Sequence, residues 1–161
     1  MGAVARGDER ALGELMRRYE RPLYRFLARH TSGRDVDDLY QETWLRAVRA
    51  ASRFDPSRRL TTWLFQIAVN LCRDWQRRRP PEPVEVSDRL AMASDPTEAR
   101  IDARRLLALL PEAQRSALVL RYYHGFSEDE VAAILGCPRG TVKSRLHLAR
   151  ARLARLTSST S

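Results

Sequence analysis

Apolar residues recur every three or four positions along most of this chain, which is the spacing of one face of an α-helix. In the N-terminal half this pattern predicts three helices, over residues 8–30, 35–52 and 61–79. Pro22 lacks a backbone donor and is expected to bend the first helix or divide it in two. Because the sequence shows no strand pattern of alternating apolar and polar residues, it predicts an all-α fold.

The pattern between Phe126 and Leu156 predicts two helices separated by a tight turn. Ser127 is a favourable N-cap, and the three acidic residues after it suit the positive end of a helix dipole. Gly136 and Pro138 interrupt the helix, and a second one begins near Arg139. Its apolar stripe leaves a basic and polar face outside, which is typical of a helix-turn-helix that lies against phosphates. An ordinary helical hairpin with a solvated basic face is the alternative.

Residues 80–95 are rich in proline and acidic residues and show no helical period, which predicts a flexible linker. Two further helices are expected after the linker, opening near Asp95-Pro96 and at Pro111-Glu112. With the helix-turn-helix they would form a C-terminal lobe over residues 96–161, while residues 1–79 form an N-terminal lobe. The predicted fold is two small helical lobes joined by a flexible acidic linker.

The net charge of +9 is divided unevenly along the 161 residues. Residues 1–79 carry 17 Lys or Arg against 10 Asp or Glu, for +7, and residues 103–161 carry 10 against 4, for +6. Residues 80–102 carry 2 against 6, for −4. Two basic blocks separated by an acidic strip suggest two lobes that bind polyanions.

The two cysteines and the hydropathy pattern limit the setting in which the protein works. Cys72 and Cys137 fall in different lobes and match no metal-ligand spacing, so buried reduced thiols are expected, with a redox-sensing disulfide as the alternative. No signal peptide is apparent, and no apolar run approaches the ~18 residues that a bilayer requires. We therefore expect a soluble cytoplasmic protein without membrane insertion.

The second predicted helix carries an acidic surface in an otherwise basic chain. Polar and acidic residues lie off its apolar stripe, together with one leucine: Asp37, Asp38, Gln41, Glu42 and Leu45. Matching of the helix dipole explains the two aspartates at the helix start but not Glu42. The surface is therefore a candidate docking site.

The third predicted helix mixes aromatic, amide and basic side chains outside its apolar stripe. Trp63, Phe65, Gln66, Asn70 and Arg73 are followed by a run of terminal arginines. This is the chemistry that holds unstacked bases against a phosphate backbone. A role of the aromatic rings in the core is equally compatible with the pattern.

Three segments in this order resemble a bacterial RNA polymerase sigma factor of the extracytoplasmic-function (ECF) class. They are DVDDLYQETWLRAVRAASRFD, TTWLFQIAVNLCRDWQRRR and LPEAQRSALVLRYYHGFSEDEVAAILGCPRGTVKSRLHLARARL. The resemblance covers roughly residues 8–156 and implies that residues 1–79 are sigma region 2 and residues 96–161 are region 4. It implies a promoter-specificity subunit that acts in the cytoplasm, associated with the nucleoid through RNA polymerase.

The resemblance also implies partners and the residues that would contact them. The clamp coiled coil of core RNA polymerase would bind Asp37, Asp38, Gln41, Glu42 and Leu45. Recognition and melting of the minus-10 element would use Arg58, Arg59, Thr61, Trp63, Asn70, Arg73, Arg77 and Arg78. Recognition of the minus-35 element would use Arg139, Thr141, Lys143, Ser144, Arg145, His147 and Arg150. An anti-sigma factor is a further implied partner, besides promoter DNA.

Two other classes of function are compatible with parts of the sequence. A free-standing transcriptional regulator would use the helix-turn-helix but would leave the acidic surface of the N-terminal lobe without a role. An enzyme is disfavoured, because Asp37 and Asp38 do not face each other on a helix and the three histidines are scattered. No Gly-rich phosphate loop is present, so no cofactor is expected.

Overall fold

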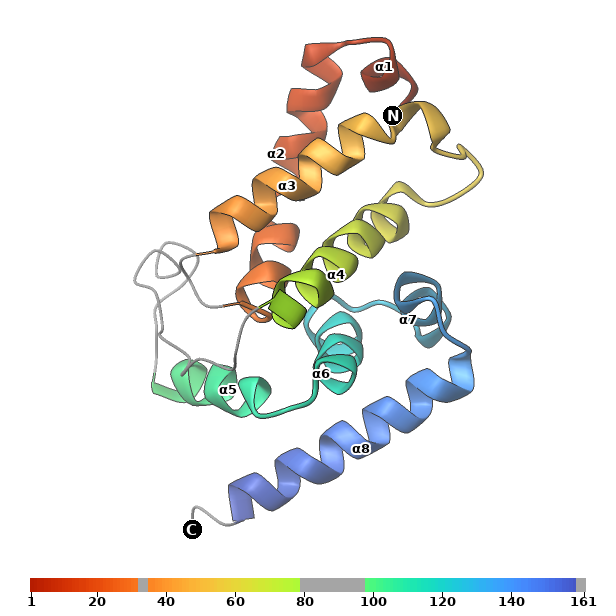
Figure 1. Ribbon diagram of the computed structural model, residues 1–161. Coiled ribbons are helices and arrows are strands. Elements are labelled where there is room, and N and C mark those ends of the chain that lie inside the picture. Colours follow the sequence, from red (N-terminus) through yellow and green to blue (C-terminus); the bar gives the residue numbers. More distant parts are fainter. Residues whose placement is uncertain (32–34, 79–97, 159–161) are drawn as a thin grey trace.

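The computed structural model describes residues 1–31, 35–78 and 98–158 (Figure 1). These residues form helices and no strand, which confirms the predicted all-α fold. The order is α1 (Gly2–Ala5), α2 (Glu9–Ala28), α3 (Val36–Arg49), the 3₁₀ turn η1 (Ala51–Arg53), α4 (Leu60–Arg78), α5 (Glu98–Ala108), α6 (Glu112–Leu118), the π-helical turn η3 (Val119–Tyr123), α7 (Glu128–Leu135) and α8 (Arg139–Ser158). The predicted linker over 80–95 lies outside the described residues. None of the described helices is long and apolar enough to span a membrane.

The N-terminal lobe is built from α2, α3 and α4, which pack around fully buried side chains such as Leu23, Phe26 and Ala47. Pro22 lies inside α2, yet the helix continues from Glu9 to Ala28 and is not divided. The N–H that Pro22 lacks would have bonded the carbonyl of Arg18, a residue whose side chain is exposed. Solvent can therefore replace the missing bond, which explains why the helix persists.

The C-terminal lobe packs α6 and α7 against α8, and it confirms the predicted helix-turn-helix. The Ser127 hydroxyl accepts from the Glu130 N–H, and the Glu130 carboxylate accepts from the Ser127 N–H, forming a capping box. Gly136 ends α7 in the left-handed region at φ 64°. The buried stripe Val142, Leu146 and Ala149 then holds α8 against the lobe.

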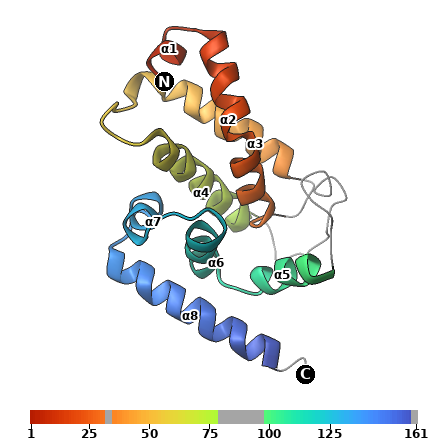
Figure 2. The ribbon, with the colours of Figure 1, turned by 180° about the vertical axis from the view of Figure 1, so that it is seen from behind.

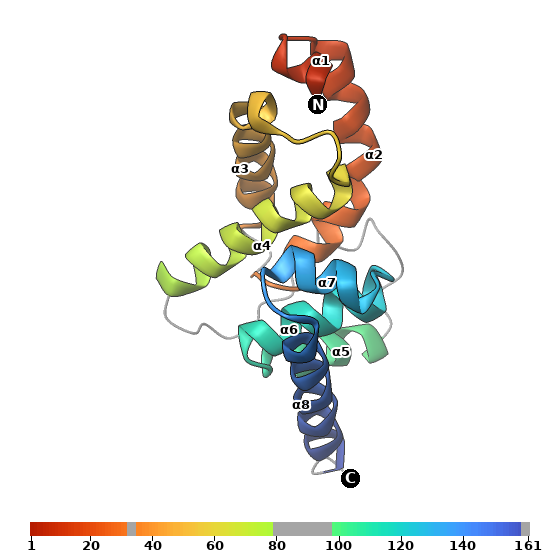
Figure 3. The same cartoon turned by 90° about the vertical axis from the view of Figure 1, so that its right-hand side faces the viewer.

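The two lobes share one continuous hydrophobic core. Helix α4 lies between them, with α2 and α3 on one side and α6 and α7 on the other (Figures 1 and 3). Phe65 of α4 is 1% exposed, and its ring centroid is 5.1 Å from that of Phe126 in the C-terminal lobe. The view from behind shows α8 along the outer edge of the molecule, away from α2 and α3 (Figure 2).

The turn of the helix-turn-helix provides a test of backbone conformation with an internal control. A Cβ added at Gly136 or at Gly140 meets no neighbouring atom within 4 Å, so neither position is limited by space. Gly136 has φ 64° and Gly140 lies within α8. We expect Gly136→Ala to lower the free energy of unfolding by about 1–2 kcal/mol. Gly140→Ala should raise it by about 0.5–1 kcal/mol, both measured by urea denaturation. Equal losses in both variants would contradict the assignment of the effect to φ.

Candidate nucleic-acid interface

The N-terminal half of α8 presents side chains of the predicted minus-35 set on the outside of the molecule. Lys143, Ser144 and His147 are exposed, whereas Thr141 is half-buried. The Ser144 hydroxyl donates to the Gly140 carbonyl at 3.1 Å. The opposite face of α8 is buried, so the exposed side chains are fixed in one direction and suited to entering a DNA groove.

The arginines of α8 that the resemblance assigns to the minus-35 element already have partners within the lobe. Arg139 lies 3.1 Å from the Glu128 carboxylate, which belongs to the acidic first turn of α7. Arg145 is half-buried, and its Nη1 lies 3.6 Å from the Cys137 sulfur. Arg150 donates to the Tyr122 hydroxyl at 3.0 Å. Because such exposed ion pairs contribute little to stability, Arg139 can exchange its carboxylate partner for a phosphate at low cost.

The acidic surface predicted on α3 is present as a patch of mixed exposure. Asp38 and Gln41 are exposed, and Leu45 is 50% exposed. Asp37 and Glu42 are half-buried, accepting from Tyr24 and from Arg46 respectively.

Val48 extends this patch beyond the predicted residues. Val48 follows the helical spacing of the apolar residues in this segment, which favours burial, yet 39% of its surface is exposed. The patch therefore combines carboxylates with two exposed aliphatic side chains, Leu45 and Val48. An aliphatic centre with polar groups around it resembles the anatomy of protein interfaces.

The loop before α4 and the first turns of α4 hold several of the predicted minus-10 residues. Arg58 and Arg59 are exposed, and Arg58 donates to the Gln66 side chain at 3.1 Å. The Thr61 hydroxyl is hydrogen-bonded to that of Tyr19 at 3.0 Å, so Thr61 is tied to α2. Trp63 is half-buried against Phe54, with a ring-centroid distance of 5.0 Å.

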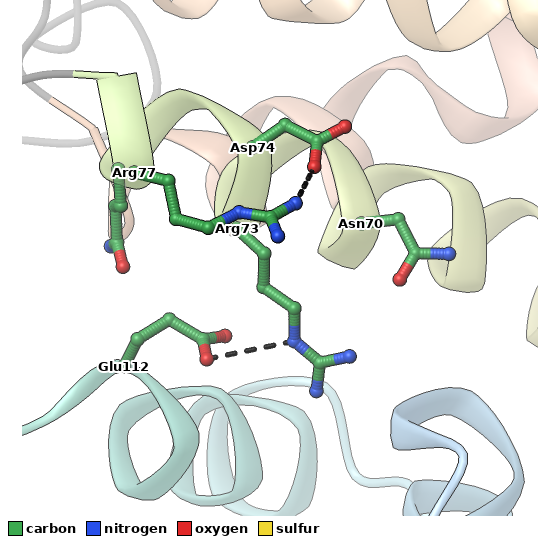
Figure 4. A pocket seen from close by; sticks show the side chains of 6 residues that line it. Asn70, Arg73, Asp74, Arg77 and Glu112 are labelled. Atoms are coloured by element: carbon green, nitrogen blue, oxygen red, sulfur yellow. Dashed lines mark hydrogen bonds and ion pairs between the residues drawn. The ribbon is translucent and has the colours of Figure 1, made fainter.

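Further along α4, the polar side chains border an open cleft of about 740 Å³ (Figure 4). Its lining residues are Asn70, Arg73, Asp74, Gln76, Arg77 and Glu112. Arg77 pairs with Asp74, and this hydrogen bond lowers the pKa of the Asp74 carboxyl. Asn70, Arg77 and Arg78 are exposed, so this end of α4 offers an amide and two guanidinium groups to a ligand. Phe65, by contrast, belongs to the core, as the second interpretation of the sequence had allowed.

The C-terminal lobe contacts α4 on this same side, through residues that the sequence did not single out. Glu112 Oε2 lies 3.5 Å from Arg73 Nε, and Glu130 pairs with Arg59. The Ser127 N–H holds the pKa of the Glu130 carboxyl below its usual range, and Arg59 acts in the same direction. No local signal reveals these contacts, because each joins residues from the two predicted lobes.

Comparisons with known proteins agree with this arrangement. The family model described as Sigma-70 region 2 matches residues 15–80, and that described as Sigma-70, region 4 matches residues 100–153. The ECF RNA polymerase sigma factor SigM of Mycobacterium tuberculosis (strain ATCC 25618 / H37Rv) is 42% identical over 165 residues, covering 97% of this chain and 82% of that protein. The ECF RNA polymerase sigma-E factor of Escherichia coli (strain K12) is 36% identical over 165 residues. The match covers 91% of this chain and 86% of that protein.

Two solved structures are similar over both lobes at once. CnrH, in complex with the cytosolic domain of CnrY, has a TM-score of 0.79 and 32% identity, covering 99% of this chain and 96% of that one. The sigma factor RpoE of Bartonella quintana, in complex with the anti-sigma factor NepR, has a TM-score of 0.78 and 28% identity. The similarity covers 91% of this chain and 96% of that chain. The placement of one lobe against the other is thus similar in these chains.

The predicted minus-35 contacts of α8 can be divided into base contacts and phosphate contacts by mutation. We expect Lys143→Ala to change the preferred base pair at one position of a duplex selected from a random library, at a cost of ~1–3 kcal/mol there. Arg150→Ala should weaken all sequences about equally and reduce the salt slope of binding by about one. Unchanged base preference in the Lys143→Ala variant would show that Lys143 does not contact a base.

Proposed function

The chain belongs to the ECF class of RNA polymerase sigma factors, and we propose that it is the promoter-specificity subunit of a bacterial RNA polymerase. It would bind core enzyme, direct it to promoters through minus-35 and minus-10 elements, and assist melting. It performs no catalysis of its own in this role and acts with the polymerase in the cytoplasm.

The observation that carries this proposal is the presence of two different surfaces in one chain. The exposed face of α8 suits duplex DNA, and the acidic and aliphatic patch on α3 suits a protein. A free-standing regulator needs the first surface only. Sigma factors named as such match both lobes over most of their length, which favours the sigma role.

In this proposal the two lobes bind different elements of the promoter. Residues 1–79 act as region 2, in which the patch on α3 docks on the clamp coiled coil of core polymerase. The loop before α4 and the polar side of α4 hold and melt the minus-10 element, through Arg58, Arg59, Thr61, Trp63, Asn70, Arg73, Arg77 and Arg78. Residues 96–161 act as region 4 and read the minus-35 element, and residues 80–95 join the two.

We further propose that an anti-sigma protein restrains this chain. The two solved relatives are each held in a complex, with the cytosolic domain of CnrY and with the anti-sigma factor NepR. Their lobes are placed as the lobes of this chain are. A partner that binds this placement would keep the chain away from core polymerase.

Reversal of charge on the α3 patch tests the docking role. We expect the Asp38→Arg/Glu42→Arg variant to lose co-purification with core polymerase, because opposed like charges cost several kcal/mol at an interface. Glu14→Arg/Glu20→Arg is the matched control, since it makes the same charge change at two exposed positions of α2. Circular dichroism should show unchanged helical content in both. Retention of wild-type core affinity by the α3 variant would refute the docking assignment.

The melting role of α4 is tested at Asn70, whose amide is exposed on the cleft side. Loss of its hydrogen bonds to an unstacked base is expected to cost ~1–3 kcal/mol. With core enzyme, Asn70→Ala should lose permanganate-reactive thymines on duplex promoter but still transcribe a template that is already mismatched at minus 10. Normal opening of the duplex, or equal inactivity on both templates, would show that Asn70 does not act in melting.

A further inference from the structure

A small apolar contact lies at the end of the N-terminal lobe where α3 stops. The short helix α1 packs on η1, the 3₁₀ turn that follows α3 (Figures 1 and 2). Val4 is the buried residue of α1, at 6% exposed, and Ala51 is the buried residue of η1, at 4% exposed. Neither side chain belongs to the hydrophobic core that the two lobes share. The contact between α1 and η1 is therefore separate from that core.

Hydrogen bonds of the intervening turn fix α1 to the start of α2. A four-residue helix has little stability of its own, because nucleation of a helix is costly. The Gly7 N–H donates to the Val4 carbonyl at 3.0 Å, and the Asp8 N–H donates to the Ala3 carbonyl at 3.1 Å. The Asp8 carboxylate in turn accepts from the Ala11 N–H at 3.0 Å, as the N-cap of α2. Helix α1 is thus held on α2 and can act as a fixed support for η1.

The turn η1 leads directly into the loop over residues 54–59, which we call the minus-10 loop. The Phe54 N–H donates to the Ala51 carbonyl at 3.3 Å, so the first residue of the loop follows the position of η1. The Phe54 ring packs against Trp63 of α4 at a centroid distance of 5.0 Å. A displacement of η1 would therefore move the ring that lies against Trp63, a residue of the predicted minus-10 set.

The two ends of the minus-10 loop are fixed by different contacts. Just after its C-terminal end, Thr61 is hydrogen-bonded to Tyr19 of α2 at 3.0 Å. Within the loop, the Ser57 N–H donates to the Asp55 carboxylate at 2.9 Å, which shapes the turn without tying it to another element. At the N-terminal end the loop depends on η1, and α1 is the main element from a distant part of the chain that packs on η1. The position of this end therefore depends on α1.

We propose that Val4 is a positioning residue for the minus-10 loop, because it holds η1 and thereby sets the loop in the orientation that reads bases. Val4 contacts no DNA in this proposal. The proposal rests on the minus-10 role given above to Arg58, Arg59 and Trp63. It adds a residue, remote from the DNA, that controls how sharply the minus-10 element is read.

A loop that is released at one end loses base readout before it loses phosphate binding. Hydrogen bonds to a base edge require narrow distances and angles, and holding a mobile loop in that geometry costs affinity. Arg58 and Arg59 are exposed, and their attraction to phosphates acts over a longer range and tolerates movement. Release of η1 should therefore lower sequence discrimination while leaving nonspecific binding of a strand nearly unchanged.

Four variants of the chain, each assembled with core polymerase, separate positioning from stability. Val4→Ser removes the apolar contact, and Val4→Ile preserves it. Ala5→Ser is the matched control, because Ala5 is an exposed residue of the same helix. Deletion of residues 2–7 removes α1 entirely and retains Asp8, the N-cap of α2.

The probe is a labelled single strand that the wild-type holoenzyme selects from a random library, compared with a strand of the same bases in scrambled order. Val4→Ser and the deletion should reduce the ratio of the two affinities about tenfold, as expected for the loss of one positioned base contact. Binding of the scrambled strand should change less than about twofold, because it depends on phosphate contacts. Val4→Ile and Ala5→Ser should keep the wild-type ratio. Co-purification with core polymerase should be unchanged in every variant.

Other results would count against the proposal. An unchanged ratio in both Val4→Ser and the deletion would overturn the positioning role and leave the sigma function intact. Equal loss of binding to both strands, together with loss of core binding, would show that α1 supports the whole lobe and not the loop. Absence of any preference in the wild-type holoenzyme would refute the minus-10 role of the loop, and this inference with it.

Fluorine NMR reports the position of the loop without DNA. The chain contains three tryptophans, which can be replaced by fluorotryptophan, and Trp63→Phe assigns the signal of Trp63 by its loss. Val4→Ser should shift this signal, because the Phe54 ring would no longer pack at the centroid distance of 5.0 Å. The signal of Trp75, near the opposite end of α4, should stay in place. An unmoved Trp63 signal in Val4→Ser would contradict the connection from Val4 to the loop.

Discussion

The two buried sides of α4 are the constraint on which the rest of the structure depends. Leu64, Ala68 and Leu71 are buried against the N-terminal lobe and the adjoining core, while Phe65 faces the C-terminal lobe. A helix that is apolar over so wide an arc must be covered on more than one side. Helices α2 and α3 provide one cover, and α6, η3 and α7 provide the other, so the position of α4 fixes where both lobes lie.

Charge is arranged so that the same groups serve two purposes. The acidic first turn of α7 stabilises its own helix start and also pairs with Arg139 and Arg59. Arg73 caps the end of α7 and reaches Glu112 of α6. Because these pairs are at least partly exposed, each is weak alone. A polyanion can therefore compete for the arginines without first dismantling the hydrophobic core of either lobe.

The features that could be predicted from the sequence are those set by local pattern. The period of the apolar residues located the helices, and the Ser127 cap and Gly136 turn identified the helix-turn-helix. The division of the first helix at Pro22 is wrong, since α2 continues through that residue, and Val48 is exposed because its neighbours do not cover that side of α3. The contacts of Glu112 and Glu130 across the lobes join residues that are distant in the chain. Such pairs leave no periodic signal, so these contacts became apparent only in three dimensions.

The coverage of α4 by α7 also has a consequence for synthesis. Helix α4 ends at Arg78 and α7 ends at Leu135, so the 57 residues from 79 to 135 are translated after the N-terminal lobe is complete. At bacterial elongation rates this delay lasts about 3–12 s. During that interval Phe65 is covered by Phe26 of α2 but not by Phe126, and Arg59 and Arg73 lack their carboxylate partners in the C-terminal lobe. The nascent protein therefore passes through an open state on the ribosome before its own C-terminal helices can close over it.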